Sequence, residues 1–175
     1  MKRFFLFLIL LFALPAGAKM LVSPIEAMKE DYSLNAKISK KNILLSNAEF
    51  YKVQKLAKVK LKTKIYRIYT AKENGKTLGY GILINKKVRS KNGVVLYFIA
   101  HDTLKGIEII AFNEPQEYLP SKKWNSQFKN QKTDKMLKLN QDIPTITGAT
   151  LSARSVTDGS RIAFAIYNIL LKDKK

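Results

Sequence analysis

Four short segments between residues 65 and 112 restrict the possible folds more than any other feature of the sequence. Their alternating or strongly apolar patterns predict strands over the following ranges: 65–71, 77–85, 94–100 and 105–112. Asn74-Gly75 predicts a hairpin turn between the first two, and His101-Asp102-Thr103 turns the chain between the last two. Because these connections are short, neighbouring strands run in opposite directions. The sequence therefore predicts a mainly antiparallel sheet.

Helical signals precede this strand region. Ser23-Pro24-Ile25-Glu26 places serine as N-cap, proline at the first helical position and glutamate to close a capping box, and predicts a helix to about Tyr32. Ala36–Leu45 suggests a short strand. Ser46-Asn47-Ala48-Glu49 is a second capping box, which predicts a helix through about Val59.

The C-terminal half reads as irregular chain followed by one long helix. We expect a loop at 113–120, a short helix or turn at 122–128 and a polar surface connector at 129–141. Apolar and small residues then recur with helical spacing, and predict a helix that begins immediately after Thr150 and runs to about Leu171. The expected fold class is α+β: an antiparallel sheet of about four to five strands flanked by helices, with a C-terminal helix.

The first eighteen residues have the features of a secretory signal peptide. Lys2 and Arg3 form a positive region, Phe4–Leu14 is a short apolar region, and Ala16-Gly17-Ala18 is a cleavage site. A membrane-spanning helix needs roughly 20 apolar residues, more than this segment has. We expect export by a Sec-type route with Lys19 as the mature terminus, and retention as an uncleaved anchor is the alternative.

The scarcity of metal-binding side chains limits the possible redox chemistry. The chain has no cysteine and a single histidine, His101. This composition excludes disulfides, a lipoprotein anchor, thiolate iron–sulfur ligation, a c-type haem and a histidine-rich metal site. Any redox activity therefore requires an organic cofactor, and no metal site is expected.

Basic residues greatly outnumber acidic ones. The chain has 32 lysines and arginines against 13 aspartates and glutamates, a net charge of +19, or +17 once Lys2 and Arg3 are removed. Such a charge favours anionic partners, namely phosphates, acidic proteins or membrane surfaces. A generally lysine-rich surface is the alternative interpretation. No nucleic-acid recognition motif is present, so we expect no nucleic-acid partner.

The segment Thr147-Gly148-Ala149-Thr150 is the most informative for function. A hydroxyl follows two very small residues and directly precedes a predicted helix, whose positive end favours a phosphate group. Arg154 can add positive charge. The simpler alternative is that Thr150 or Ser152 is an ordinary helix N-cap. No Ser-His-Asp arrangement, carboxylate pair or Walker-type loop is evident, so no catalytic residue is assigned.

Residues 147–158, Thr-Gly-Ala-Thr-Leu-Ser-Ala-Arg-Ser-Val-Thr-Asp, resemble the flavinylation motif of FMN-binding domains of the RnfG/NqrC type, also found in NosR-like proteins. The resemblance extends over about residues 46–172 through the strand order and the segment from Asn113 to Phe128. It implies an FMN-binding domain at 46–175, which follows the helix and strand that the local patterns predict within residues 19–45. The family usually has an aspartate six residues before the modified threonine, where this chain has Pro144.

The resemblance implies a covalent FMN, joined to Thr150 by a phosphoester. In this family a magnesium-dependent transferase of the ApbE type moves FMN from FAD onto the second threonine of the motif. Seven residues of the motif are implied at the cofactor: Thr147, Gly148, Ala149, Thr150, Leu151, Ser152 and Arg154. Outside the motif, Glu114 and Tyr118 lie in a loop that the family places near the flavin. For Trp124 there are two interpretations, stacking on the flavin ring and packing in the core.

These features together predict an exported flavoprotein that transfers electrons between membrane and periplasmic redox partners. We expect it in the periplasm or at the outer face of the inner membrane, and not as an integral membrane protein once the signal peptide is removed. One alternative is a flavin-dependent reductase acting directly on a small extracytoplasmic substrate. Another is a cofactor-free binding module that uses its basic surface.

Overall fold

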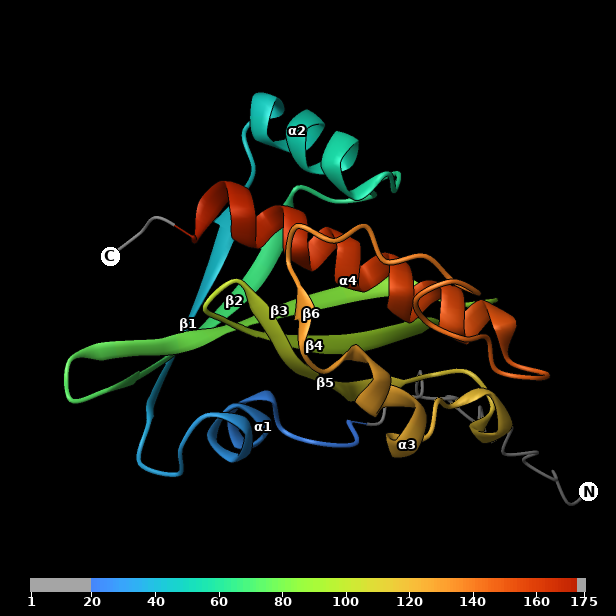
Figure 1. Ribbon diagram of the computed structural model, residues 1–175, viewed down its shortest axis with the longest axis horizontal. Coiled ribbons are helices and arrows are strands. Elements are labelled where there is room, and N and C mark those ends of the chain that lie inside the picture. The colour runs from blue at the N-terminus through green and yellow to red at the C-terminus, as the bar shows by residue number, and fades with distance from the viewer. Residues whose placement is uncertain (1–19, 173–175) are drawn as a thin grey trace, which may run out of the picture.

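The computed structural model describes residues 20–172 (Figure 1). The signal peptide expected at residues 1–18 lies outside the described residues. The helices are α1 (Pro24–Asp31), α2 (Asn47–Ala57), α3 (Lys122–Asn125) and α4 (Thr150–Leu170), with short 3₁₀ turns η1 (Gln116–Tyr118) and η2 (Ser126–Phe128). The strands are β1 (Lys37–Leu44), β2 (Ile65–Glu73), β3 (Lys76–Lys87), β4 (Asn92–Ala100), β5 (Thr103–Phe112) and β6 (Gln131–Lys132).

The six strands found in residues 20–172 form one sheet, in which each strand pairs antiparallel with its neighbour in sequence. The α+β class and the antiparallel order predicted from the hairpin signals are therefore confirmed. The sheet has one strand more than the upper end of the predicted range. The strand that the sequence analysis missed is β6, in which Lys132 pairs with Thr103. A strand of two residues within a polar connector is too short to show a period of two.

Helices cover both faces of the sheet. Helix α4 runs along one face with α2 lying over it, and α1 covers part of the opposite face (Figure 1). The main core lies under α4, where Tyr97, Ile99 and Ile166 are fully or almost fully buried. A second, smaller core joins Met28 of α1 to the other face of the sheet. None of the helices in residues 20–172 is long and apolar enough to cross a membrane.

The predicted helix starts differ in outcome. Ser46 forms the expected capping box, since its hydroxyl accepts from the Glu49 amide at 3.3 Å and its amide donates to the Glu49 carboxylate at 2.8 Å. The capping box predicted at Ser23 is wrong, because the Ser23 side chain makes no cap hydrogen bond there. Instead the main-chain carbonyl of Ser23 accepts from Ala27 at 3.0 Å, and Pro24 occupies the first turn as predicted.

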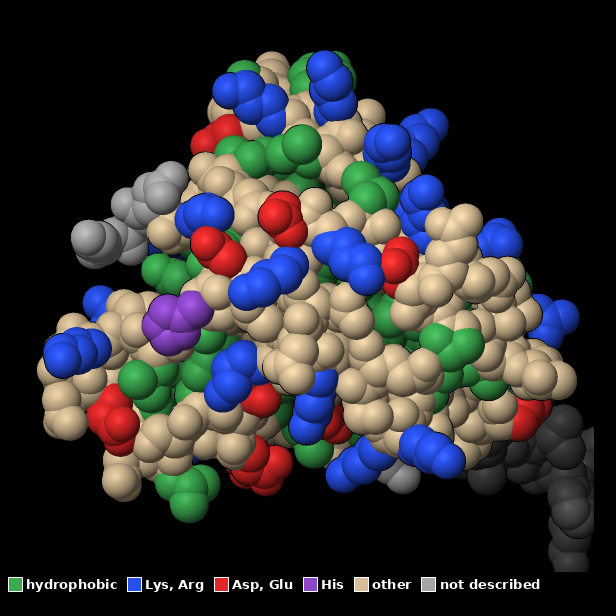
Figure 2. Space-filling model, viewed as in Figure 1, with side chains coloured by type: hydrophobic (Ala, Val, Ile, Leu, Met, Phe, Trp, Pro, Cys, Tyr) green, Lys and Arg blue, Asp and Glu red, His purple; other side chains and the backbone are tan. Residues whose placement is uncertain are grey.

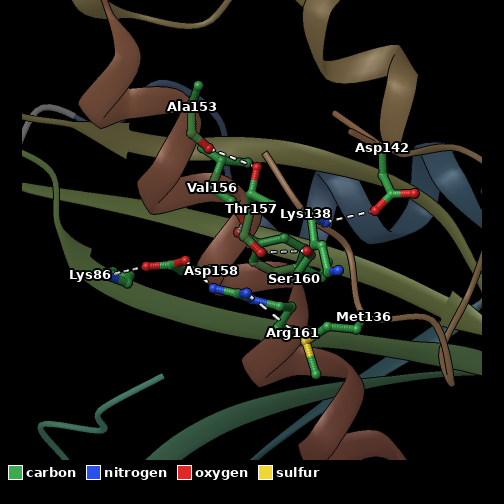
Figure 3. A network of polar contacts seen from close by, with 11 residues as sticks. Lys86, Met136, Lys138, Asp142, Ala153, Val156, Thr157, Asp158, Ser160 and Arg161 are labelled. Atoms are coloured by element: carbon green, nitrogen blue, oxygen red, sulfur yellow. Dashed lines mark hydrogen bonds and ion pairs between the residues drawn. The ribbon is translucent and has the colours of Figure 1, made fainter. Parts of the chain in front are cut away.

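Buried contacts between α4 and the sheet set the position of this helix. The hydroxyl of Tyr97, a fully buried residue of β4, donates to the Val156 carbonyl at 2.7 Å. Gly159 permits this approach, because a Cβ at that position would lie 2.2 Å from the Tyr97 hydroxyl oxygen. On the same helix Asp158 pairs with Arg161 and, at 3.2 Å, with Lys86 of β3 (Figure 3). These contacts determine where the first residue of α4, Thr150, lies.

Candidate functional site

The N-terminus of α4 has no side-chain cap. Thr150 is the first residue of the helix, so the N-cap position falls on Ala149, which has no hydrogen-bonding side chain. The interpretation of Thr150 or Ser152 as an ordinary N-cap is therefore wrong. An alanine N-cap typically costs a helix about 1 kcal/mol relative to serine, threonine, asparagine or aspartate. The structure thus leaves the Thr150 hydroxyl exposed and unused by the helix start.

Two backbone amides at this helix start are free to bind an anion. The amides of Ser152 and Ala153 both donate to the Ala149 carbonyl, at 3.0 and 3.1 Å. The backbone bonds among residues 20–172 include none from the amides of Thr150 or Leu151. The unpaired amides and the helix dipole together favour a negatively charged group at this end of α4.

Gly148 supplies the conformation that the turn before α4 requires. Its φ is +76°, a left-handed value that residues with a Cβ adopt only at a cost. A Cβ built at Gly148 would have nothing within 4 Å, so the space beside it is open. The requirement for glycine here is therefore conformational, and the surface around Thr150 stays accessible to a bulky partner.

A pocket of about 330 Å³ opens beside the start of α4. Its lining joins the segment from Gly148 to Ser152 with side chains from two distant segments of the chain. The distant residues are Val88, Arg89, Glu114 and Tyr118. The structure therefore brings two of the sequence-predicted residues, Glu114 and Tyr118, to the same pocket as Thr150.

The hydroxyl of Ser152 is buried in this pocket without a partner. Ser152 is only 1% exposed, and its Oγ makes no hydrogen bond within the described part of the chain. Leaving a buried hydroxyl unpaired costs roughly 1–3 kcal/mol. Such a group in a pocket lining points to a ligand that would complete its hydrogen bonding.

Glu114 anchors the turn that joins β3 to β4. Its Oε1 accepts from the amides of Arg89, Ser90 and Lys91 at 2.9, 2.6 and 2.7 Å, and its Oε2 accepts from the Ser90 hydroxyl at 3.1 Å. These bonds, the one from the Lys91 amide foremost, hold the pKa of the Glu114 carboxyl below its ordinary value. The carboxylate therefore stays charged and is occupied by the turn.

The sequence analysis missed two residues that line the pocket, Val88 and Arg89, and Arg89 is the charged one. Its Nη1 donates to the Tyr118 hydroxyl at 3.2 Å, and its guanidinium carbon lies 5.7 Å from the centroid of the Tyr118 ring. Arg89 lies in a hairpin turn far from Thr150 in sequence, and no local pattern connects the two. Hydrogen bonds between Glu114 and the turn that bears Arg89 connect Arg89 to the rest of the pocket.

Three sequence-predicted residues do not line the pocket: Thr147, Arg154 and Trp124. Thr147 and Arg154 are exposed on either side of the helix start. Trp124 is buried, with its ring centroid 5.3 Å from that of Phe128. Its Nε1 donates to the Pro144 carbonyl at 2.9 Å, so Trp124 holds the loop that leads into the site.

Asp142 also braces that loop. Its Oδ1 accepts from Lys135 at 2.9 Å and its Oδ2 accepts from the Lys138 amide at 2.8 Å, and the bond from Lys135 is the main reason that its pKa is lowered. Figure 3 shows Asp142 beside Lys138, on the segment that precedes α4. The acid nearest to the position where the family usually has an aspartate is thus part of the loop structure.

Positive charge is spread over the face of the molecule that Figure 2 shows. Figure 2 shows lysine and arginine side chains distributed over one whole face rather than gathered in one block. Arg161, a basic residue of α4, pairs with Asp158. A larger cavity, of about 760 Å³, lies at the opposite end of α4 beside His101 and Tyr167, and its lining includes none of the sequence-predicted site residues.

Comparisons with known proteins agree with this geometry. The sequence model of one family, described as FMN-binding domain, matches residues 27–165. Among solved structures, the crystal structure of Shewanella oneidensis NqrC is similar, with a TM-score of 0.53 and 15% sequence identity over 79% of this chain and 81% of that chain. At this identity the likeness shows a shared fold. No curated protein matches the sequence.

Proposed function

The chain belongs to the FMN-binding domain family and is a flavin-binding protein, and from this premise we propose that it carries FMN covalently and transfers electrons. In this proposal the FMN phosphate is esterified to the hydroxyl of Thr150. The protein then passes electrons between a membrane donor or acceptor and a periplasmic partner. Export through the signal peptide at residues 1–18 places it where such partners lie.

The observation that supports this function best is the uncapped start of α4. Thr150 presents an exposed hydroxyl beside two free amides, and the Ser152 hydroxyl lies unpaired in the adjoining pocket. A phosphate ester at Thr150 would offer acceptor oxygens to those donors. The groups present therefore fit a phosphate, and the open turn at Gly148 leaves room for it.

Attachment by a transferase of the ApbE type fits this arrangement. The Thr150 oxygen attacks the phosphorus on the FMN side of FAD, forming the ester and breaking the pyrophosphate bond. AMP leaves with the bridging oxygen, and the hydroxyl proton passes to the transferase or to solvent. Because Thr150 is exposed and Gly148 has open space around it, a separate enzyme can reach the hydroxyl.

The bound FMN would supply reversible uptake of electrons, and the protein would hold and tune it. The pocket beside Thr150 has a volume of about 330 Å³, within the usual range for small-molecule sites of roughly 300–1,000 Å³. The ester prevents loss of FMN by diffusion in a compartment that cannot resynthesise it. These properties favour an electron carrier that works with a separate oxidoreductase.

The direct test is intact-mass analysis of the full chain co-produced with an ApbE-type transferase. The wild-type protein should gain the mass of FMN less one water. Thr150→Val should lose this gain, Thr150→Ser should retain it, and the matched control Thr77→Val, at an exposed threonine of β3 outside the pocket, should keep it as well. An unmodified wild-type chain, or a Thr150→Val chain that still gains the mass, would refute covalent attachment at Thr150.

A further inference from the structure

We propose that Arg89 stabilises the reduced flavin and raises its reduction potential, an inference that rests on the proposed function. It concerns a residue that neither the motif nor the family match singles out. The charges that line the pocket and the rigidity of the turn that bears Arg89 both support this role.

Arg89 and Glu114 are the charged residues among those that line the pocket. Glu114 already accepts four hydrogen bonds from the turn at residues 89–91. Its negative charge is thus offset by backbone amides and a hydroxyl. Arg89 forms none of the ion pairs found within residues 20–172, and its described side-chain contacts are with the neutral ring and hydroxyl of Tyr118. The positive charge of its guanidinium is therefore available to a bound group.

The turn holds Arg89 at the pocket. The amide of Val88 donates to the Lys91 carbonyl at 2.9 Å and closes the turn, and Glu114 binds three successive amides inside it. The bond to the Tyr118 hydroxyl then orients the guanidinium. Because the guanidinium is already held in place, it does not have to be ordered when a bound group gains negative charge. It therefore stabilises that charge more than a mobile side chain would.

The physical reason is differential stabilisation. Uptake of two electrons and one proton leaves a net negative charge on a flavin, whereas the oxidised ring is neutral. A nearby cation therefore stabilises the reduced form more than the oxidised form. Because Arg89 is exposed to solvent, the effect is moderate. We expect about a tenfold change in the ratio of reduced to oxidised flavin at a given potential, or about 30 mV for a two-electron couple.

The experiment is a reductive titration of the flavinylated full chain with dithionite and a reference dye. The variants are Arg89→Met, Arg89→Lys and, as a matched control, Lys55→Met, which removes an exposed charge on α2. Arg89→Met should lower the midpoint potential by about 30 mV, and Arg89→Lys should retain most of the wild-type value. Lys55→Met should not change the potential. Raising the ionic strength should shrink the difference between Arg89→Met and wild type.

The outcomes separate this inference from the function on which it rests. Flavinylated Arg89→Met with the wild-type potential would refute the role of Arg89 while leaving the proposed function intact. A wild-type chain that takes up no flavin would refute both. Equal unfolding temperatures of the unmodified wild type and Arg89→Met are expected as well, since the potential should change without a loss of structure.

Discussion

Replacing Gly159 by alanine tests how α4 is held on the sheet and therefore how Thr150 is positioned. On propensity alone the change should stabilise the helix, because alanine is favoured over glycine in a helix interior by about 1 kcal/mol. The structure predicts the opposite. A Cβ at Gly159 would lie 2.2 Å from the Tyr97 hydroxyl oxygen and 2.9 Å from the ring carbon that bears it.

The size of the effect follows from the surroundings of Tyr97. This side chain is fully buried, so it can move only by displacing core neighbours. Overpacking of this kind costs about 1–3 kcal/mol. Movement of the hydroxyl away from the Val156 carbonyl, now 2.7 Å distant, would leave a buried polar group unpaired at a further cost of about 1–3 kcal/mol. After the gain in propensity, the expected net loss is about 3 kcal/mol.

The assay is thermal and urea unfolding of the unmodified protein. Gly159→Ala should lower Tm by about 6–12 °C for a domain of this size. Adding Tyr97→Phe removes the nearest clashing atom, so the double variant should be more stable than the sum of the single effects by about 1 kcal/mol. Arg154→Ala, on the exposed side of the same helix, should change stability by less than about 0.5 kcal/mol. A Gly159→Ala protein as stable as wild type would refute this account of the packing.

Two further predictions concern the pocket. Ser152→Ala removes an unpaired buried hydroxyl, so the unmodified variant should unfold at the same or a higher temperature than the unmodified wild type. Flavinylation should raise the Tm of this variant by less than it raises that of wild type. A lower Tm of the variant before modification would contradict the unpaired state of the hydroxyl. The pKa of Glu114 is lower in the folded protein than in the unfolded chain. The ionised Glu114 therefore stabilises the folded protein at pH values above its unfolded-state pKa of about 4.3, and this stabilisation is lost as the pH falls through the folded-state pKa. Urea unfolding at pH 7 and pH 3 should therefore show a smaller acid-induced loss for Glu114→Gln than for wild type, and equal losses would disprove the assignment.

Local sequence signals predicted most of the fold. The strand segments, the Asn74-Gly75 turn and the Ser46 capping box depend on interactions between residues a few positions apart, and the structure has all of them. The strand β6 escaped prediction because its two residues pair with β5 across a long connector and have no pattern of their own. The capping box predicted at Ser23 does not form, because the correct spacing of Ser23 and Glu26 alone does not ensure that the Ser23 side chain makes its cap hydrogen bond.

What the sequence by itself determined is the antiparallel sheet, the C-terminal helix that follows the Thr147–Thr150 segment and the small-residue turn in that segment, because each depends on local spacing and conformational preference. The tertiary structure alone decided that the cap position falls on Ala149, that the Ser152 hydroxyl is buried without a partner, and that Arg89 faces the same pocket. The physical reason is that the pocket forms only where the start of α4 meets the turn between β3 and β4 and the segment after β5, and contacts such as Tyr97 with Val156 hold α4 in that place. Such contacts join residues far apart in the chain, and no period or short motif encodes them.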